Sequence, residues 1–302
     1  MHDLIIIGGG PAGMTAAVYA ARKKMDVLLI TKEFGGQMMW TREIENYLGF
    51  QYITGPELIN KFEEHVKKFP VNTRYEEVIR LSVAEDGAFR VTTDQEKYQG
   101  KTVIIASGKR PRRLGVPGEE EFTGRGVAYC ATCDGPLYAG KAVAVVGGGN
   151  SALQAAIELS GIAEKVYLVV RGAYKADPVV VDKLEAAANV EVLRGYTARE
   201  IAGRDTVERF RIDSKERGEE KELDVQGIFV EIGLDPNSEF ARETVKLNRY
   251  NEIAVDCRAC SNIPGLFAAG DVASGPDKQI IIAAGDGAKA ALVAYEYLLH
   301  RR

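Results

Sequence analysis

The sequence predicts an α/β fold with two Rossmann-like nucleotide-binding domains, because one strand–loop–helix pattern occurs twice in its 302 residues. In each copy an apolar run leads into a glycine-rich loop, and a helical stretch follows. The loops begin at Gly8 and Gly147. A third observation concerns chemistry: Cys130 and Cys133 form a Cys-x-x-Cys motif, and Cys133 lies fourteen residues before the second loop.

The first loop reads Gly8-Gly-Gly10-Pro11-Ala12-Gly13, between an apolar run at 4–7 and an expected helix at about 14–24. In this pattern the first glycine makes a tight turn and the second lets a pyrophosphate approach the backbone. The third lets the helix pack on the strand, and the helix N-terminus faces the anion. After a second expected strand at 27–30, Glu33 is the candidate for binding a ribose hydroxyl, although it comes slightly late in the sequence.

The second loop repeats these features between an expected strand at 142–146 and an expected helix at 151–159. It reads Gly147-Gly-Gly149-Asn150-Ser151-Ala152, with alanine in place of the third glycine, which the fingerprint allows. The next expected strand covers 166–170. Two complete units in one chain predict two bound dinucleotides.

Two cations follow the strand at 166–170, namely Arg171 and Lys175, and no acidic side chain stands at the strand end. An acidic residue there favours a free ribose 2′-hydroxyl, whereas a cation favours a 2′-phosphate. The pattern therefore leans toward NADPH, with NADH still possible. The alternative is that Arg171 is only a solvated loop charge.

The composition indicates a soluble protein, with 46% hydrophobic and 27% charged residues and a net charge of −4. This balance argues against nucleic acid or an anionic membrane as partner. No apolar run approaches the roughly 20 residues of a membrane span. Because an apolar strand begins directly after Met1-His2-Asp3, we expect no signal peptide and a cytoplasmic location.

The Cys130–Cys133 motif is a dithiol that can close into an easily reduced disulfide. A nucleotide loop close downstream suggests electron transfer between a nucleotide cofactor and this disulfide. None of the three histidines lies near the motif in sequence, so Asp134 is the best acid–base candidate.

A zinc site is the alternative for these cysteines, since a second pair, Cys257 and Cys260, could complete four ligands. The two pairs are much further apart than in a zinc ribbon, and we expect no metal. Cys257 and Cys260 are interpreted as incidental thiols, with a secondary redox pair as the alternative.

With these motifs the sequence resembles the low-molecular-weight thioredoxin reductases over essentially its whole length. Segments such as Cys133-Asp-Gly-Pro-Leu and 227–237 are also similar to the flavoprotein subunit of alkyl hydroperoxide reductase. The resemblance implies FAD at the first loop and a second domain inserted in the first. We expect a discontinuous FAD-binding domain, 1–112 and 241–302, and an NAD(P)H-binding domain, 113–240, that carries the dithiol.

The resemblance also implies further cofactor contacts. They are Gly35, Gly36, Gln37, Asn46, Ala106, Gly108, Gly270, Asp271, Lys278, Gln279 and Ile280. The implied activity is thioredoxin-disulfide reductase, in which electrons pass from NAD(P)H through FAD to Cys130–Cys133 and on to thioredoxin or a thioredoxin-like protein. A homodimer is implied as well.

The chain departs from the family after the strand at 166–170. Thioredoxin reductases usually carry His-Arg-Arg and a further arginine there, whereas this chain has Val170-Arg171-Gly172 and then Lys175. Two alternatives therefore stay open. One is an NADH- or ferredoxin/flavodoxin-dependent flavoprotein reductase of a peroxiredoxin-linked partner. The other is a flavin relay protein with little thioredoxin reductase activity.

Overall fold

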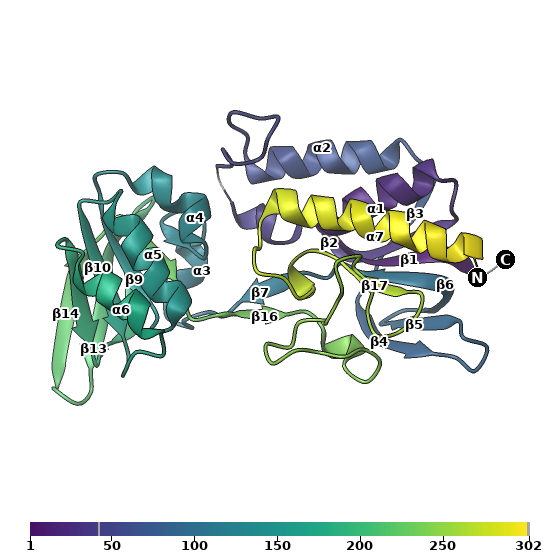
Figure 1. The fold of residues 1–302 in the computed structure, drawn as a ribbon. Coiled ribbons are helices and arrows are strands. Elements are labelled where there is room, and N and C mark those ends of the chain that lie inside the picture. Colours follow the sequence, from purple (N-terminus) through teal and green to yellow (C-terminus); the bar gives the residue numbers. More distant parts are fainter. Residues whose placement is uncertain (42, 301–302) are drawn as a thin grey trace. The chain divides into compact units, whose positions relative to one another are not determined.

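The computed structural model describes residues 1–41 and 43–300, and the chain divides into two compact units (Figure 1). Unit 1 comprises Met1–Met39, Ile44–Arg110 and Asp235–Arg302. Unit 2 comprises Trp40–Glu43 and Pro111–Leu234. The chain thus passes from one main body to the other after residue 110 and returns after residue 234. The expected boundaries were after residues 112 and 240. The assignment of a nucleotide to each unit stays a prediction.

Unit 1 is built on a seven-stranded sheet of order β3-β2-β1-β6-β5-β4, with β17 paired to β6. Its strands are β1 (His2–Gly9), β2 (Val27–Phe34), β3 (Val71–Tyr75), β4 (Val78–Val83), β5 (Phe89–Thr93), β6 (Lys97–Ile105) and β17 (Leu266–Ala268). The strands β3, β2, β1, β6 and β17 are parallel to one another, while β4 and β5 form an antiparallel extension. The carboxyl ends of five strands therefore lie along one edge of the sheet.

Both faces of this sheet are buried, which is why the central strands are continuous apolar runs. Alternate residues of β1 point to opposite faces: Leu4 and Ile6 join the core under the helices, and Ile5 and Ile7 join the core on the other side. The helices of the first core are α1 (Pro11–Arg22), α2 (Gly55–Lys67) and α7 (Ile280–His300). Helix α1 begins three residues earlier than expected, because Pro11 at its first position has the φ of a helix and needs no N–H partner.

Unit 2 is built on a five-stranded parallel sheet of order β11-β10-β9-β15-β8. The strands are β8 (Val127–Ala128), β9 (Ala142–Val146), β10 (Lys165–Val170), β11 (Val190–Arg194) and β15 (Gly227–Val230). One face packs on α5 (Asn150–Ser160) and α6 (Pro178–Glu185). The other packs on an antiparallel sheet of β12 (Thr197–Gly203), β13 (Val207–Ser214) and β14 (Glu219–Asp224).

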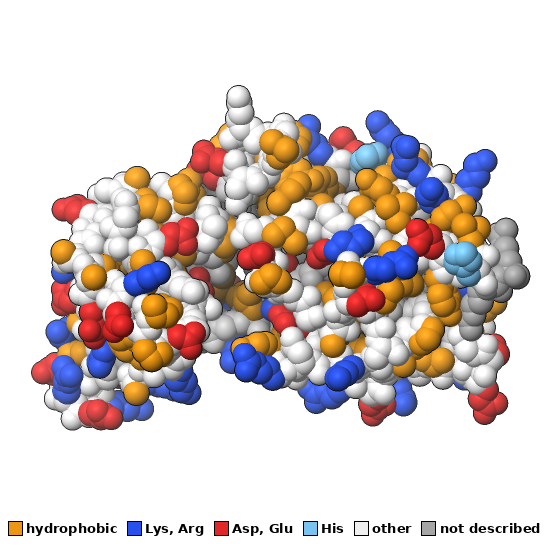
Figure 2. Space-filling view, viewed as in Figure 1, with side chains coloured by type: hydrophobic (Ala, Val, Ile, Leu, Met, Phe, Trp, Pro, Cys, Tyr) orange, Lys and Arg blue, Asp and Glu red, His pale blue; other side chains and the backbone are white. Residues whose placement is uncertain are grey.

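The charged segment at 215–222 contains the turn between β13 and β14, which pair as an antiparallel hairpin. Figure 2 shows acidic and basic side chains interspersed at the end of unit 2 that carries these strands. Arg211 lies 2.7 Å from the carboxylates of both Glu200 and Glu222. Exposed ion pairs of this kind contribute little to the free energy of folding. Because acidic and basic side chains are interspersed, this surface has no large region of a single charge.

The two crossings between the main bodies of the units are short strands that pair with each other. Strand β7 (Lys109–Pro111) pairs with β16 (Leu234–Pro236). Pro111 and Pro236 stand at the ends of these strands, where a missing N–H costs little. The remaining short elements are α3 (Glu119–Phe122), α4 (Ala131–Asp134) and the 3₁₀ turns η1 (Gly36–Trp40), η2 (Gly135–Tyr138), η3 (Glu239–Ala241) and η4 (Gly270–Val272).

Among the helices of the described residues, none combines the length and the apolar character that crossing a membrane requires.

Helix α7 packs closely on α1 at Gly287, and a methyl group there would collide with the backbone carbonyl of Ala12. We expect Gly287→Ala to lower the free energy of unfolding by about 1–3 kcal/mol, because the two helices must separate. Gly285→Ala is the matched control on the same helix, since a Cβ at Gly285 meets no atom within 4 Å. Alanine there should raise stability by up to about 1 kcal/mol. Urea unfolding followed by circular dichroism measures both, and equal effects would contradict this account of the packing.

Candidate functional site

The first glycine loop joins β1 to α1 with a backbone that only glycines allow. A Cβ on Gly8 would overlap the carbonyl of Ala106, and a Cβ on Gly13 would overlap the carbonyl of Gly8. Gly10, by contrast, faces open space, and a Cβ there would meet no atom within 4 Å. No side chain caps α1, and no acidic residue stands in its first turn. The first N–H groups of α1 are therefore left for an anion that reaches the backbone at Gly10.

The other cofactor residues predicted for unit 1 gather at the carboxyl ends of its parallel strands. Ala106 and Gly108 follow β6, Gly270 and Asp271 follow β17, and Gly35–Gln37 follow β2. Glu33 lies at the end of β2, and Gly9 pairs with Phe34, so this acidic side chain stands beside the loop. In an open parallel sheet, ligands bind at this edge. Their contacts with a cofactor stay predictions.

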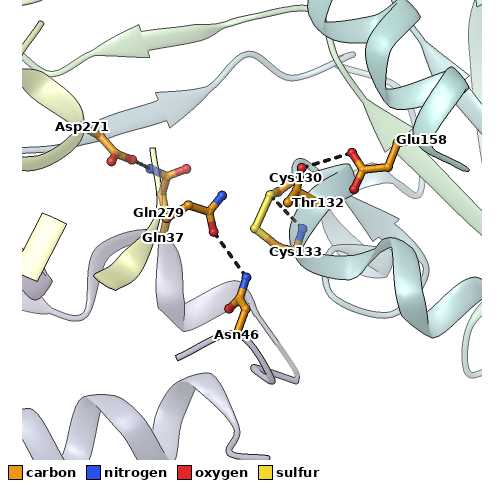
Figure 3. Close-up of a disulfide and its surroundings, with 8 residues drawn as sticks. All are labelled: Gln37, Asn46, Cys130, Thr132, Cys133, Glu158, Asp271 and Gln279. Carbon is orange, nitrogen blue, oxygen red and sulfur yellow. Dashed lines mark hydrogen bonds between the residues drawn. A yellow bond between two sulfur atoms is a disulfide. The ribbon is translucent and has the colours of Figure 1, made fainter. Parts of the chain in front are cut away.

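Two hydrogen bonds connect predicted cofactor residues that are more than 200 positions apart in sequence (Figure 3). The amide of Gln37 donates to the carboxylate of Asp271 at 3.0 Å. The amide of Asn46 donates to the side-chain oxygen of Gln279 at 3.3 Å. Burial raises the pKa of Asp271 above its usual range. A half-buried carboxylate at a strand end can accept a hydrogen bond from a sugar hydroxyl.

Lys278 belongs to a cluster of ion pairs in unit 1 that the sequence did not indicate. Lys109 and Glu252 form a pair at 2.6 Å, and each side chain is only 9% exposed. The ammonium of Lys278 lies 3.5 Å from Glu252 and donates to the carbonyl of Ala273 at 2.6 Å. Burial lowers its pKa. Within the described residues Lys278 thus has a structural role next to the segment that starts α7, and its predicted contact with a cofactor stays a prediction.

The second glycine loop has the same geometry as the first. A Cβ on Gly147 would overlap the carbonyl of Glu231, which follows β15, while Gly149 faces open space. Helix α5 has no side-chain cap and no acidic residue in its first turn. The first amides of α5, where Asn150 and Ser151 stand, are therefore available to a second anion.

The segment after β10 is hydrogen-bonded to this loop. The N–H of Lys175 donates to the carbonyl of Gly148 at 2.7 Å. The side chain of Asn150 both donates to the carboxylate of Asp177, at 2.9 Å, and accepts from its N–H, at 2.7 Å. This pairing occupies the one carboxylate of the segment and leaves the exposed Arg171 and Lys175 as its cations.

A third cation, Arg194, stands at the same edge and was missed in the sequence. Strand β11 runs parallel to β10, and Arg194 pairs with Val170, directly before Arg171. The guanidinium carbon of Arg194 lies 4.1 Å from the ring centroid of Tyr174. The signal was available in principle, because a basic residue ending the next parallel strand reaches the same edge.

The two cysteines form a disulfide with a Cα–Cα distance of 5.3 Å. Cys130 is the N-cap of α4, and its Sγ accepts a hydrogen bond from the N–H of Cys133 at 3.2 Å (Figure 3). A small dithiol of this kind can be opened and closed by thiol–disulfide exchange. Both sulfurs belong to residues that are partly accessible.

Asp134 ends the same short helix and is half-buried. Burial raises its pKa to about 6, and the carboxylate of Glu43 contributes further. A carboxyl group with this pKa exchanges protons near neutral pH, as a general acid or base requires.

Two glutamates beside the dithiol were also missed. Glu158 on α5 accepts a hydrogen bond from the hydroxyl of Thr132 at 3.1 Å. The carboxyl group of Glu231 is near the backbone of Ala131, and burial raises its pKa to about 7. Glu231 comes directly after the buried strand β15, and this position at the end of a parallel strand was the signal that could have identified it.

The second cysteine pair lies in unit 1, whereas the dithiol lies in unit 2. Cys257 and Cys260 carry free thiols, and burial raises the pKa of Cys260. Over the part of the chain that the structure describes, no three or more His, Cys, Asp or Glu side chains are arranged to hold a metal ion.

Comparison with known proteins places these features in a family. Residues 2–289 match the pattern of the pyridine nucleotide-disulphide oxidoreductases. The chain is 44% identical over 303 residues to the F subunit of alkyl hydroperoxide reductase from Pseudomonas putida, covering 98% of this chain and 58% of that protein. It is 43% identical over 298 residues to an NADH dehydrogenase of Bacillus subtilis, covering 98% of this chain and again 58% of the relative. The chain therefore spans less than two thirds of these curated relatives.

Solved structures of smaller relatives match over their full length. Thioredoxin reductase from Streptococcus pyogenes superposes with a TM-score of 0.95 at 40% identity, and 99% of each chain is covered. Thioredoxin reductase from Giardia duodenalis gives a TM-score of 0.92 at 31% identity, again with 99% of each chain covered. With its two glycine loops and its Cys130–Cys133 disulfide, this chain has the fold of the thioredoxin reductases and belongs to the pyridine nucleotide-disulphide oxidoreductases.

Proposed function

We propose that the protein is an NADPH-dependent thioredoxin-disulfide reductase, with FAD bound to unit 1. The observation that carries this proposal is the Cys130–Cys133 disulfide on a helix of the same unit as the second glycine loop. In this proposal FAD passes the electrons of the nucleotide to this disulfide, and a partly accessible disulfide can pass them on by exchange.

The residues of unit 1 fit FAD. The uncapped N-terminus of α1 and the open space at Gly10 suit a pyrophosphate, and Asp271 and Gln37 offer polar atoms at the sheet edge. When bound, FAD accepts two electrons from the nicotinamide and passes them to a disulfide. The protein supplies the binding groups, the dithiol and the proton donor.

Exchange with the partner then needs only this chain's own residues. Once reduced, one cysteine attacks the partner's disulfide as a thiolate, and a mixed disulfide forms while one partner sulfur leaves. The second cysteine attacks the mixed disulfide, which restores Cys130–Cys133 and releases the partner as a dithiol. Asp134 lies next to Cys133 and can give a proton to the departing sulfur.

The partner is proposed to be thioredoxin or a thioredoxin-like protein, because the full-length structural matches are thioredoxin reductases. A second candidate follows from the 44% identity to the F subunit of alkyl hydroperoxide reductase: an NADH-dependent reductase whose thioredoxin-like partner serves a peroxiredoxin. We also expect a homodimer, as in the thioredoxin reductases that the sequence resembles.

Replacing Cys133 tests the exchange step. We expect Cys133→Ser to abolish reduction of a thioredoxin disulfide while reduction of the bound flavin by NADPH continues at the wild-type rate. The reason is that hydride transfer needs no thiol, whereas disulfide exchange needs both. Stopped-flow absorbance at the flavin band and a thioredoxin assay measure the two steps. Cys257→Ser is the matched control and should change neither; thioredoxin reduction that survives in Cys133→Ser would refute the role of the dithiol.

Asp134 should impose a pH dependence on this exchange. Its pKa of about 6 keeps it protonated below that pH, so the rate of a step that needs its proton falls as the pH rises through about 6. Asp134→Asn should lower kcat/KM at pH 6 by about 10²-fold and remove this limb of the profile. Glu164→Gln, at an exposed carboxylate in the same unit, should leave the profile unchanged. If the rate of Asp134→Asn still falls as the pH rises through about 6, the titrating group is not Asp134.

Nucleotide choice can be measured by anaerobic bleaching of the flavin with NADPH and NADH side by side. The cations Arg171, Lys175 and Arg194 favour a ribose 2′-phosphate, so NADPH should bleach the flavin at lower concentration. Arg171→Ala and Arg194→Ala should each raise the half-saturating NADPH concentration about tenfold and leave NADH unaffected. Arg209→Ala, on β13, is the control. Faster bleaching by NADH would favour the second candidate, and slow bleaching by both would point to another electron donor.

A further inference from the structure

We propose that Glu252 is a positioning residue for the cofactor site of unit 1, where its carboxylate and its backbone turn hold three segments that carry predicted FAD contacts. The proposal rests on the proposed function only in taking unit 1 as the FAD-binding unit. Neither Glu252 nor its partner Lys109 is among the residues that the family resemblance implies as cofactor contacts.

The carboxylate of Glu252 is fixed first by its own turn. One of its oxygens accepts a hydrogen bond from the side-chain amide of Asn248 at 2.7 Å. The side-chain oxygen of Asn248 accepts the N–H of Glu252 at 3.0 Å, and the N–H of Asn248 donates to the carbonyl of Glu252 at 2.8 Å. Because three hydrogen bonds join the same two residues, the carboxylate has a defined position within the turn.

The other oxygen of this carboxylate faces two ammonium groups. The Nζ of Lys109 lies 2.6 Å from it, and the Nζ of Lys278 lies 3.5 Å from it. The side chains of Lys109 and Glu252 are each 9% exposed, and that of Lys278 is 17% exposed. Water screens such a cluster little, so the loss of one partner leaves a buried charge without compensation.

The two lysines belong to different segments with predicted cofactor contacts. Lys109 directly follows Gly108, in the segment after β6, and Lys278 directly precedes Gln279, at the start of α7. The ammonium of Lys278 also donates to the carbonyl of Ala273 at 2.6 Å. Glu252 therefore joins the end of one central strand to the start of a helix that is far away in the sequence.

The residue after Glu252 holds a third segment. The N–H of Ile253 donates to the carbonyl of Val272 at 2.9 Å, and the carbonyl of Ile253 accepts the N–H of Ser274 at 2.8 Å. Val272 directly follows Asp271, the predicted partner of a sugar hydroxyl. The turn that fixes the carboxylate of Glu252 is thus itself bonded to the backbone beside Asp271.

The charge of Glu252 matters as well as its position. Burial lowers the pKa of Lys278, and Glu252, followed by Asp271, opposes this effect. A neutral residue at position 252 would leave two ammonium groups beside one polar atom, where they repel each other. Because Lys278 is the more exposed of the two lysines, we expect it to move toward water and to displace the start of α7.

The affinity of the full-length protein for FAD tests the proposal. The FAD-loaded protein is diluted in series, free FAD is separated by ultrafiltration, and its fluorescence gives the Kd. Glu252→Gln keeps the size and one acceptor but removes the charge, and we expect it to raise the Kd about tenfold. Glu252→Asp keeps the charge and withdraws the carboxylate by one methylene, so it should fold and should raise the Kd about fivefold.

A double-mutant cycle tests whether the lysines act through this carboxylate. Lys109→Met alone should raise the Kd for FAD about threefold, because Glu252 keeps its bonds to Lys278 and Asn248. Lys109→Met combined with Glu252→Gln should also raise it only about threefold, since the repulsion between the ammonium groups is gone. Independent effects would multiply to about thirtyfold and would contradict the proposal.

Glu243→Gln is the matched control in the same unit. The side chain of Glu243 is 80% exposed and pairs with Arg80 at 3.1 Å, so its loss should change the Kd by less than about twofold. A rise equal to that of Glu252→Gln would overturn the proposal. So would a wild-type Kd in both Glu252→Gln and Glu252→Asp, even if these variants unfolded at lower urea concentration, because Glu252 would then only stabilise the fold.

Failure of the proposed function has a different signature. In that case the wild-type protein would not reduce thioredoxin with NADPH, while the FAD affinities of the Glu252 variants would still differ from the wild type as described.

Discussion

The arrangement of both units depends on one constraint, the approach of a glycine backbone to the end of a neighbouring strand. At Gly8 the neighbour is the carbonyl of Ala106, and at Gly147 it is the carbonyl of Glu231. These contacts bring the start of each helix to the carboxyl edge of a parallel sheet without a side chain to cap it. The N–H groups at the start of each helix are then left without a side-chain acceptor, as an anion-binding site requires. A β-carbon at either glycine would separate strand from loop, and the edge would lose the anion site on which the rest of the chemistry depends.

In unit 2 the same constraint joins two functions that the sequence presents as separate motifs. Helix α5 starts at the nucleotide loop and carries Glu158, which contacts Thr132. Strand β15 ends beside Gly147 and continues into Glu231, whose carboxyl group is near the backbone of Ala131. The disulfide thus stands on a short helix next to two elements that meet at the second glycine loop. A helix of four residues has little stability of its own, so its geometry has to come from such contacts.

The sequence predicted the local features of this protein well and its long-range ones poorly. The strands at β1 and β9, the loops at Gly8 and Gly147 and the dithiol follow from short patterns, because apolar periodicity and glycine spacing act over a few residues. Arg194 reaches the edge at Arg171 only through the register of β10 with β11, and Glu231 reaches Ala131 across 100 residues. The pairing of Lys109 with Glu252, and of β7 with β16, depends in the same way on segments far apart in the chain. The predicted contacts of individual residues with a cofactor depended on family resemblance, because no local sequence pattern specifies such contacts.

The pairing of β7 with β16 has a consequence for how such a chain can change over evolution. The polypeptide leaves unit 1 and returns to it through adjacent strands, whose backbones in any sheet lie about 4.8 Å apart. An inserted domain with neighbouring termini can be exchanged, lengthened or lost at this point while the host sheet keeps its order β3-β2-β1-β6. Unit 2, which carries the dithiol, is therefore separable from unit 1, which we propose holds the flavin. Recombination at two neighbouring positions would be enough to join the same host sheet to a different inserted unit.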